Sequence, residues 1–298
     1  MSLPILNPPR KDDLKRTYRL ELWFSEIHHE HHGITIRIEK TLFSGQSPYQ
    51  RVDVFETVPF GRMLTLDGVV MTTELDEFIY HEMLVHVPLF THPRAQDLLI
   101  IGGGDGGSVR EARKYASLRH IHLVEIDEMV LRASREHLPT LSRDLDGPTV
   151  QITIQDGVEF VKGKDPSYDV VLIDSSDPYG PGVGLFEESF YQDVFSLLRE
   201  DGLMVAQSES AMADLNLVKS TYRRLRATFP IVRVYLATIP TYPLSLWSFT
   251  LASKRWDPLR DFSTERVRDS GIQTRYYNAE IHRGAFALPN FVREGLEA

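Results

Sequence analysis

The chain has 298 residues, of which 42 are acidic and 33 are basic, and its formal net charge is −9. This balance argues against nucleic acid as the main partner, because phosphate contacts depend on patches of Lys and Arg. No segment approaches the ~20 apolar residues of a membrane helix, and the absence of cysteine excludes disulfides and thiol catalysis. We therefore expect a cytoplasmic protein that binds no nucleic acid and no membrane, and whose charge is compatible with cationic small ligands.

Residues 1–73 predict a small N-terminal module of antiparallel β-strands. Apolar and polar side chains alternate from Ile34 to Ile38 and again from Arg51 to Val58, which is typical of half-buried strands. The Asp67-Gly68 pair that follows is a common turn sequence between such strands.

Residues 74–298 form the second predicted domain, in which buried strands alternate with helices. This alternation predicts a doubly wound α/β fold, with a mostly parallel sheet and helices on both faces. The last two strands have no room for a helix between them, so they should form an antiparallel hairpin at the edge of the sheet. The expected strands are Leu98–Ile101, Ile121–Glu125, Val150–Ile154, Val170–Asp174, Leu203–Gln207, Ile231–Thr238 and Leu246–Ala252, and the expected helices are residues 73–90, Ser108–Lys114, Asp127–His137, Glu187–Arg199 and Leu215–Thr228.

The first strand of this domain runs into a glycine-rich turn, residues 102–107, with the sequence GGGDGG. A strand, a glycine turn and a helix form the nucleotide pocket at the carboxyl end of the first strand in open α/β sheets. Glycines let the backbone turn tightly and approach a ligand closely. A carboxylate within the turn would not suit a pyrophosphate, so Asp105 indicates a ligand that carries positive charge.

Carboxylates also follow the next three strands. Glu125 ends the second strand, Asp156 follows the third, and Asp174 and Asp177 follow the fourth. The carboxyl ends of parallel strands meet at the edge where open α/β sheets bind ligands. Glu125 is placed to accept from both hydroxyls of a ribose, and Asp156 with the adjacent Gly157 is placed to accept from the exocyclic amine of a base. The paired Asp174 and Asp177 suit an amine, whose proton one of them can accept.

The motifs occur in the order GGGDGG, HLVEID, QDG, DSSDPYGP and IPTYP, and with them the chain from Leu22 to its end resembles the spermidine synthases. These polyamine aminopropyltransferases have a Rossmann-like fold of the class I methyltransferase type. The resemblance implies that the aminopropyl group of decarboxylated S-adenosylmethionine is transferred to a diamine, preferably putrescine, with release of 5'-methylthioadenosine. It implies no cofactor beyond this co-substrate, no metal, and a homodimer or homotetramer.

The resemblance also implies roles for individual residues. Asp174 matches the catalytic acid, which would accept the proton of the attacking amine. The residues that match the donor site are Gln50, Asp105, Glu125, Asp156, Gly157 and Pro181, and those that match the polyamine site are Tyr80, His81, Asp174, Asp177, Gln207 and Tyr242.

One departure from the family pattern leaves the acceptor open. After Tyr242-Pro243 the family typically continues with Ser-Gly, whereas this chain has Leu244-Ser245. A bulky Leu244 would reshape the far end of the diamine channel, so agmatine, cadaverine and spermidine remain alternative acceptors.

Two other classes of function remain open from the sequence. A methyltransferase that uses S-adenosylmethionine would share the fold, but Asp105 would repel the carboxylate of its donor. A polyamine sensor without turnover would not need Asp174 beside a sulfonium.

Three other features favour a structural interpretation. The cluster of His28, His29, His31 and His32 lacks acidic or cysteine partners at a known metal-ligand spacing, so we expect a solvated turn. Trp247 is expected in the core or in the channel wall, of which we favour the core, and residues 254–271 are expected to form a polar surface segment.

Overall fold

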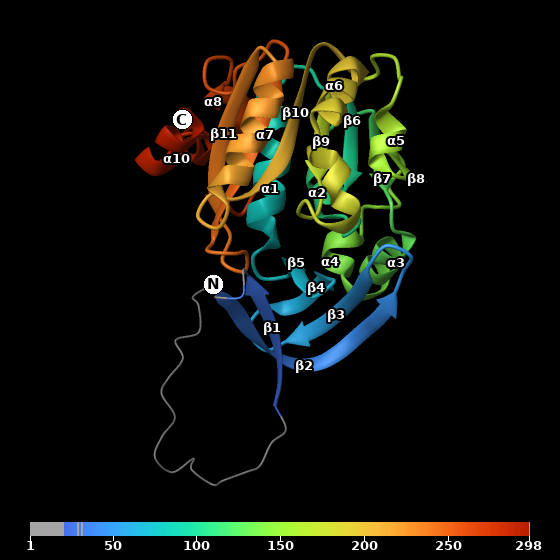
Figure 1. The fold of residues 1–298 in the computed structure, drawn as a ribbon. Coiled ribbons are helices and arrows are strands. Elements are labelled where there is room, and N and C mark those ends of the chain that lie inside the picture. The colour runs from blue at the N-terminus through green and yellow to red at the C-terminus, as the bar shows by residue number, and fades with distance from the viewer. Residues whose placement is uncertain (1–20, 29, 31, 298) are drawn as a thin grey trace.

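The computed structural model describes residues 21–28, 30 and 32–297, which form two sheets connected through a buried helix (Figure 1). The smaller sheet has five antiparallel strands in chain order, as the alternating sequence predicts. Its strands are β1 (Leu22–His28), β2 (His32–Gln46), β3 (Arg51–Thr57), β4 (Gly61–Leu66) and β5 (Val69–Thr73).

The larger sheet has seven strands in the order β11-β12-β10-β9-β6-β7-β8. Strands β10, β9, β6, β7 and β8 are parallel, and the antiparallel β11–β12 hairpin pairs with β10. The predicted α/β fold with a mostly parallel sheet and a hairpin at one edge is confirmed. The bounds are β6 (Asp97–Gly102), β7 (His120–Glu125), β8 (Val150–Ile154), β9 (Tyr168–Asp174), β10 (Leu198–Ser210), β11 (Ile231–Thr238) and β12 (Leu246–Ser253).

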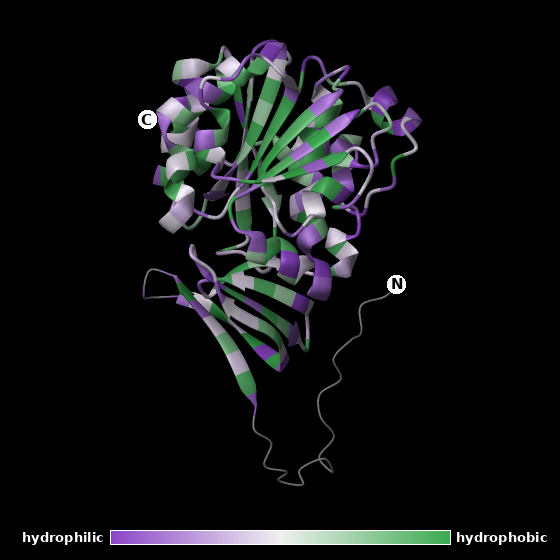
Figure 2. Ribbon diagram, turned by 90° about the vertical axis from the view of Figure 1, so that its right-hand side faces the viewer, coloured by the Kyte–Doolittle hydropathy of each residue, from purple (hydrophilic) through white to green (hydrophobic). Residues whose placement is uncertain are grey.

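Successive residues of the central strands face opposite sides of the larger sheet. In β6, Leu98 and Ile100 belong to one apolar cluster, whereas Leu99 and Ile101 belong to the cluster on the other face. Because helices cover both faces, such strands are continuous apolar runs rather than alternating ones. Figure 2 shows this concentration of hydrophobic residues along the strands of the larger sheet.

The longer helices agree with the sequence to within a few residues, whereas the sequence did not indicate α4, α5, α8, α9 and α10, each of eight residues or fewer. None of the described helices is long and apolar enough to cross a membrane. The bounds are α1 (Glu77–Thr91), α2 (Gly107–Ala112), α3 (Glu128–His137), α4 (Pro139–Ser142), α5 (Gly157–Val161), the 3₁₀ helix η2 (Gly180–Phe186), α6 (Glu188–Leu197), α7 (Leu215–Thr228), α8 (Thr264–Asp269), α9 (Ala279–Ala285) and α10 (Asn290–Glu297).

Helix α1 follows the smaller sheet in the chain and packs against α2, β9, β10 and β11 of the larger domain. All of its residues except Phe78 and Ile79 are buried, including two glutamates and two histidines. Buried polar groups in native proteins have hydrogen-bond partners, so these side chains are tied to the surrounding elements. Glu82, for example, accepts from the backbone N–H groups of residues 275, 276 and 277 at 2.7–2.8 Å.

Residues 254–271 form only in part the polar surface segment that their composition predicts. Asp257 and Phe262 are buried. The Arg266 guanidinium donates to the carbonyl oxygens of Phe90 and His92, both at 3.0 Å, where α1 ends. Arg266 thus has distant partners in the chain, and through it the segment contacts the end of α1.

Candidate active site

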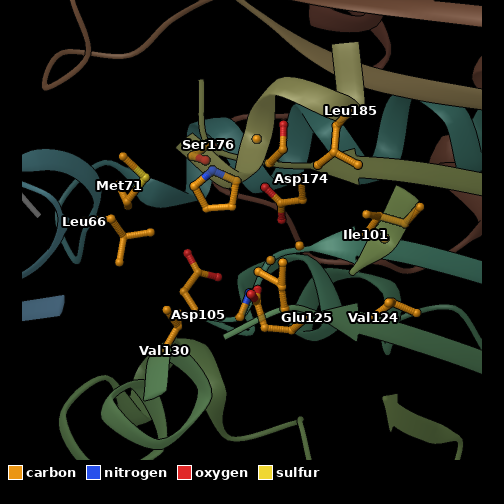
Figure 3. Close-up of a pocket in the computed structure, with 18 of the residues that line it drawn as sticks. Leu66, Met71, Ile101, Asp105, Val124, Glu125, Val130, Asp174, Ser176 and Leu185 are labelled. Carbon is orange, nitrogen blue, oxygen red and sulfur yellow. The ribbon is translucent and has the colours of Figure 1, made fainter. Parts of the chain in front are cut away.

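The carboxyl ends of the parallel strands border a pocket of about 880 Å³, here called the main pocket. Figure 3 shows Asp105, Glu125 and Asp174 around this cavity, with Leu66 and Met71 approaching from the smaller sheet. The main pocket therefore lies where the larger sheet meets the smaller one.

The glycine turn after β6 is pressed against the end of β9. Gly102 has φ +81° and Gly103 has φ +71°, in the left-handed region. A Cβ atom on Gly102 would lie 2.2 Å from the Asp174 carbonyl oxygen, and one on Gly103 would lie 2.7 Å from its Oδ2. These two glycines are thus required for the close approach of the turn to Asp174, whatever ligand binds beside them.

Glu125, at the end of β7, is held by two backbone groups. Its Oε1 accepts from the N–H of Asp127 at 2.9 Å, and its Oε2 accepts from the N–H of Gly104 at 3.1 Å. Burial raises the pKa of Glu125 to about 7, although these N–H groups act against the shift. The carboxylate is therefore fixed in orientation at the wall of the main pocket.

Asp127 was not among the predicted site residues, yet it joins the smaller sheet to the larger domain. Its Oδ2 accepts from Ser47 Oγ at 2.6 Å and from Gln50 Nε2 at 3.1 Å. Its Oδ1 caps α3 by accepting from the N–H of Met129 at 2.9 Å. The sequence signals this residue only as a helix cap, which is the more common role of an aspartate at such a position.

Asp174 occupies the centre of the site. Its Oδ1 accepts from Tyr80 Oη at 2.8 Å, and its Oδ2 accepts from Ser108 Oγ at 2.6 Å. Desolvation raises the pKa of Asp174, the charge of His81 opposes this rise, and the charge of Asp105 adds to it. The charge of Asp174 consequently depends on the two ionisable groups beside it.

A second cavity, here called the side pocket, shares Met71, Tyr80, Ser175, Ser176 and Tyr242 with the main pocket. The side pocket continues to residues that the main pocket does not reach, among them Asp177, Gln207 and Trp247. Asp174, on the wall of the main pocket, immediately precedes the shared Ser175 and Ser176.

Gln207 holds the loop that lines the side pocket. Its Nε2 donates to the carbonyl oxygens of Ser175 and Ser176 at 3.2 and 3.3 Å, and its Oε1 accepts from the N–H of Glu209 at 3.0 Å. Both ends of the amide are therefore engaged within the protein, which favours an orienting role at the pocket wall.

Two acidic residues that the sequence did not indicate, Glu26 and Glu209, lie beyond the side pocket. They line a groove that shares Val69, Asp177 and Pro243 with the side pocket. Burial and the charge of Asp177, with which it forms a hydrogen bond, raise the pKa of Glu209 to about 9. Burial also raises the pKa of Glu26 to about 7, against a hydrogen bond from the N–H of Val70, and the charge of Asp177 adds to the rise. We call Glu26, Asp177 and Glu209 the distal carboxyl group.

Little in the sequence could have identified the two missed residues. Glu209 stands in a β-bulge of β10 with φ +70°, and Glu26 is in the edge strand β1. A bulge turns a side chain that strand alternation would direct elsewhere, so only the folded strand reveals where Glu209 points.

Every predicted site residue lines one of the two pockets. Those at the main pocket are Gln50, Tyr80, His81, Asp105, Glu125, Asp156, Gly157, Asp174, Pro181 and Tyr242, and those at the side pocket include Asp177 and Gln207. Their individual roles remain predictions.

Leu244 does not line the diamine channel that its bulk was expected to reshape. Its side chain is 49% exposed and lines neither pocket. Leu244 has φ +51° and Ser245 has φ +61°, so the backbone adopts a turn in which glycine is common. Trp247 is buried, as predicted, and also lines the side pocket.

The histidine cluster is described only in part, because His29 and His31 lie outside the described residues. His28 ends β1, and its Nε2 lies 2.8 Å from Glu26 Oε1, while His32 begins β2 directly opposite His28. The described part is therefore the end of a hairpin next to the distal carboxyl group.

Comparison with known proteins identifies the family. Residues 77–263 match the spermine/spermidine synthase domain, and residues 22–74 match the spermidine synthase tetramerisation domain. The chain belongs to the spermine/spermidine synthase family. Its members are polyamine aminopropyltransferases, and this chain is an enzyme of that class.

Relatives cover nearly the whole chain. A polyamine aminopropyltransferase of Alkaliphilus oremlandii is 46% identical over 280 residues, which are 93% of this chain and 99% of the relative. A polyamine aminopropyltransferase of Caldicellulosiruptor bescii is 48% identical over 275 residues, which are 92% of this chain and 98% of that relative.

Two solved structures of the family have the same fold. A spermidine synthase in complex with the transition state analogue AdoDATO has a TM-score of 0.92 and 44% identity, and the match covers 96% of this chain and 99% of that one. The spermidine synthase of Thermotoga maritima has a TM-score of 0.91 and 43% identity, over 97% and 99% of the two chains. The Rossmann-like class I methyltransferase-type fold is thereby confirmed.

The raised pKa of Glu209 predicts a specific pH dependence of stability. The unfolded chain releases this proton near pH 4.5, whereas the folded protein retains it until about pH 9. The stability that Glu209 contributes is therefore fully present below pH 4.5 and is lost as the pH rises to about 9. Over this range the free energy of unfolding falls by up to ~1.4 kcal/mol per pH unit. Glu209→Gln keeps a neutral hydrogen-bonding side chain, so the free energy of unfolding of this variant should decrease less steeply with pH.

Chemical denaturation from pH 5 to 9 at one protein concentration would measure this slope. The exposed Glu294→Gln on α10 serves as the control and should retain the slope of the unmodified protein. Equal slopes for Glu209→Gln and the unmodified protein would contradict the assignment.

Proposed function

We propose that this enzyme transfers the aminopropyl group of decarboxylated S-adenosylmethionine to putrescine, giving spermidine and 5'-methylthioadenosine, with Asp174 as the general base. The observation that carries the proposal is the position of Asp174 beside the junction of two pockets. Asp105 lies on the main-pocket side of this junction, and Asp177 lies on the side-pocket side. This spacing suits two cationic substrates whose reactive ends meet at Asp174.

The main pocket suits the donor. Glu125 would accept from both ribose hydroxyls, since its two oxygens are already oriented by backbone groups. Asp156 with Gly157 would receive the amine of adenine, and Pro181 would pack against the ring. Asp105 would take the ammonium at the end of the aminopropyl chain.

Gln50 would reach the same donor from the smaller sheet, in the orientation set by Asp127. Donor binding would thereby engage both sheets at once. The AdoDATO complex of the related spermidine synthase supports a small-molecule site in this fold.

The side pocket suits the diamine. Tyr80 and Tyr242, whose ring centroids lie 5.8 Å apart, line both pockets and would pack against the methylene chain. Asp177 would anchor the second ammonium, and the rest of the distal carboxyl group, Glu26 and Glu209, lies in the adjoining groove. His81 would act at the amine end of the donor through Asp105, whose Oδ2 lies 3.3 Å from the His81 Nε2.

The chemistry requires a free amine. An alkylammonium has a pKa near ~10.4, and a protonated nitrogen has no lone pair with which to attack. Asp174 would accept this proton as the nitrogen attacks the methylene carbon next to the sulfonium. The C–N bond forms, the C–S bond breaks with its electron pair on sulfur, and methylthioadenosine leaves as a neutral thioether.

Desolvation and alignment would supply much of the rate. The positive sulfonium and the dry site lower the pKa of the attacking amine, which reduces the cost of moving its proton to Asp174. The two pockets hold both substrates in line, so an encounter of two solutes becomes a reaction within one complex. Since the sulfonium is already an activated leaving group, we propose no metal and no separate cofactor.

We also propose a homodimer or homotetramer in the cytoplasm. The match of residues 22–74 to a tetramerisation domain supports self-association. Leu22, Trp23 and Ile27 of the edge strand β1 are 50–62% exposed, which is consistent with a contact surface on this sheet.

The first test offers putrescine, cadaverine, agmatine and spermidine separately with decarboxylated S-adenosylmethionine, and measures the release of methylthioadenosine. S-adenosylmethionine is the control donor. We expect the fastest release with putrescine. Faster release with another acceptor would replace putrescine in the proposal, and no release with any acceptor would contradict aminopropyl transfer.

Asp174→Asn should leave donor binding nearly unchanged and lower kcat by about 10²–10⁴-fold, because it removes the proton acceptor but not the shape of the site. Donor affinity is measured by calorimetry and turnover by methylthioadenosine release. The exposed Asp146→Asn serves as the control. Turnover of Asp174→Asn close to that of the control would refute a general-base role.

Asp105→Asn should weaken binding of the decarboxylated donor by about 10-fold or more, since a charged hydrogen bond to its ammonium is lost. The preference over S-adenosylmethionine should narrow, because the repulsion of that donor's carboxylate is lost as well. Calorimetric titration of both donors measures the ratio of affinities. An unchanged ratio would show that Asp105 does not select between the donors.

A further inference from the structure

The ring of His81 is held between two carboxylates. Its Nδ1 lies 2.7 Å from Glu77 Oε2, and its Nε2 lies 3.3 Å from Asp105 Oδ2. A neutral imidazole has one N–H donor and one lone pair, whereas an imidazolium donates from both nitrogens. When both carboxyl groups are ionised, only the imidazolium satisfies both contacts, because a neutral ring would turn a lone pair toward a carboxylate.

The position of this ring is tightly constrained. His81 is 2% exposed, and its imidazole lies directly over Gly107, where a Cβ atom would be 2.3–2.5 Å from three ring atoms. The edge of Tyr80 packs against it with ring centroids 5.3 Å apart. The ring therefore cannot turn to exchange its partners without moving α1 or α2.

Glu77 is itself fixed by Arg110, which lines neither the main pocket nor the side pocket. Arg110 Nη1 donates to Glu77 Oε1 at 2.9 Å, and Arg110 Nη2 donates to Glu77 Oε2 at 2.8 Å. Burial alone would raise the pKa of Glu77, but His81 and Arg110 lower it to about 2. Glu77 therefore remains charged across the physiological range and faces His81 in one orientation.

We propose that Glu77, locked by Arg110, holds His81 as an imidazolium, and that this buried cation keeps Asp105 and Asp174 ionised side by side. Two neighbouring carboxylates in a desolvated site otherwise share a proton, and a proton on Asp174 would remove the base. Glu77 is thus a positioning residue that acts through His81. This role rests on the proposed function, because it matters only if Asp174 accepts a proton.

The groups around His81 agree with this assignment. Glu77 comes from α1, Asp105 from the glycine turn and Asp174 from β9, and the two phenols nearby, Tyr80 and Tyr242, donate their hydroxyl protons elsewhere. With His81 charged, the end of the main pocket carries two negative groups and one positive group. Its net charge of −1 matches the single ammonium of the aminopropyl chain.

The charge of His81 is measured directly by NMR. In the ligand-free enzyme labelled with ¹⁵N-histidine, His81→Gln identifies the His81 signals, and the ring nitrogens are followed between about pH 6 and 9. We expect His81 to remain doubly protonated throughout. In Glu77→Gln, whose side chain keeps the size but loses the charge, His81 should titrate within this range.

Glu111→Gln is the matched control. Glu111 is equally buried and pairs with the same Arg110 at 3.0 Å, but it contacts His86 instead of His81. The His81 signals of the Glu111→Gln variant should behave as in the unmodified enzyme. The acid limb of the kcat/KM profile should move to higher pH by about one unit or more in Glu77→Gln, and it should stay in place in Glu111→Gln.

A neutral His81 ring in the unmodified enzyme at pH 7 would overturn the proposal, even if Glu77→Gln failed to fold. An unchanged His81 titration in a folded Glu77→Gln variant would overturn it as well. If the unmodified enzyme transferred no aminopropyl group, the proposed function would fail on its own, and the ring titration would still decide the charge of His81.

Discussion

The structure depends on a concentration of negative charge at the carboxyl edge of the larger sheet. Asp105, Glu125, Asp156 and Asp174 line one pocket, each at or just after the carboxyl end of one of four neighbouring parallel strands, β6, β7, β8 and β9. Burial raises the pKa of Glu125 and of Asp174 and so favours protonation of these two groups. What surrounds them therefore decides which are ionised. Glu125 has backbone N–H groups, Asp174 has two hydroxyl donors, and Asp105 has the imidazole of His81.

This constraint also explains why α1 is so polar for a buried helix. It carries Tyr80 and His81 to the site, and it carries Glu77 to His81 and Arg110. On a different side, Glu82 fastens the same helix to the backbone of residues 275–277. The carboxyl-terminal segment, remote from the pockets, thus helps to fix the helix on which the electrostatics of the site depend.

The sequence predicted what local pattern determines, and it missed what only tertiary contact determines. Continuous apolar runs such as Leu98–Ile101 predicted the parallel strands. The acid after each run predicted that the carboxylates gather at one edge of the sheet, because both features follow from strand geometry. Glu209 was missed since a bulge redirects it, and Asp127 was missed since its partners are 77 and 80 residues away. Leu244 was misplaced because a left-handed backbone turns it toward solvent, which no side-chain pattern reveals.

The pKa values of the distal carboxyl group connect acceptor binding to proton release. Glu209, with a pKa raised to about 9, holds its proton at neutral pH, and Glu26, with a pKa raised to about 7, is partly protonated there. A diamine that brought an ammonium beside Asp177 would stabilise the charged forms of both neighbours and so promote the loss of their protons. Acceptor affinity would then rise with pH until the amines themselves begin to lose their charge near ~10. In the proposed mechanism the requirement at the other end of the diamine is reversed, because the reacting nitrogen would give up its proton to Asp174. The two ends of one diamine would thus meet carboxyl groups in opposite roles, one stabilised by the ammonium and one that removes its proton.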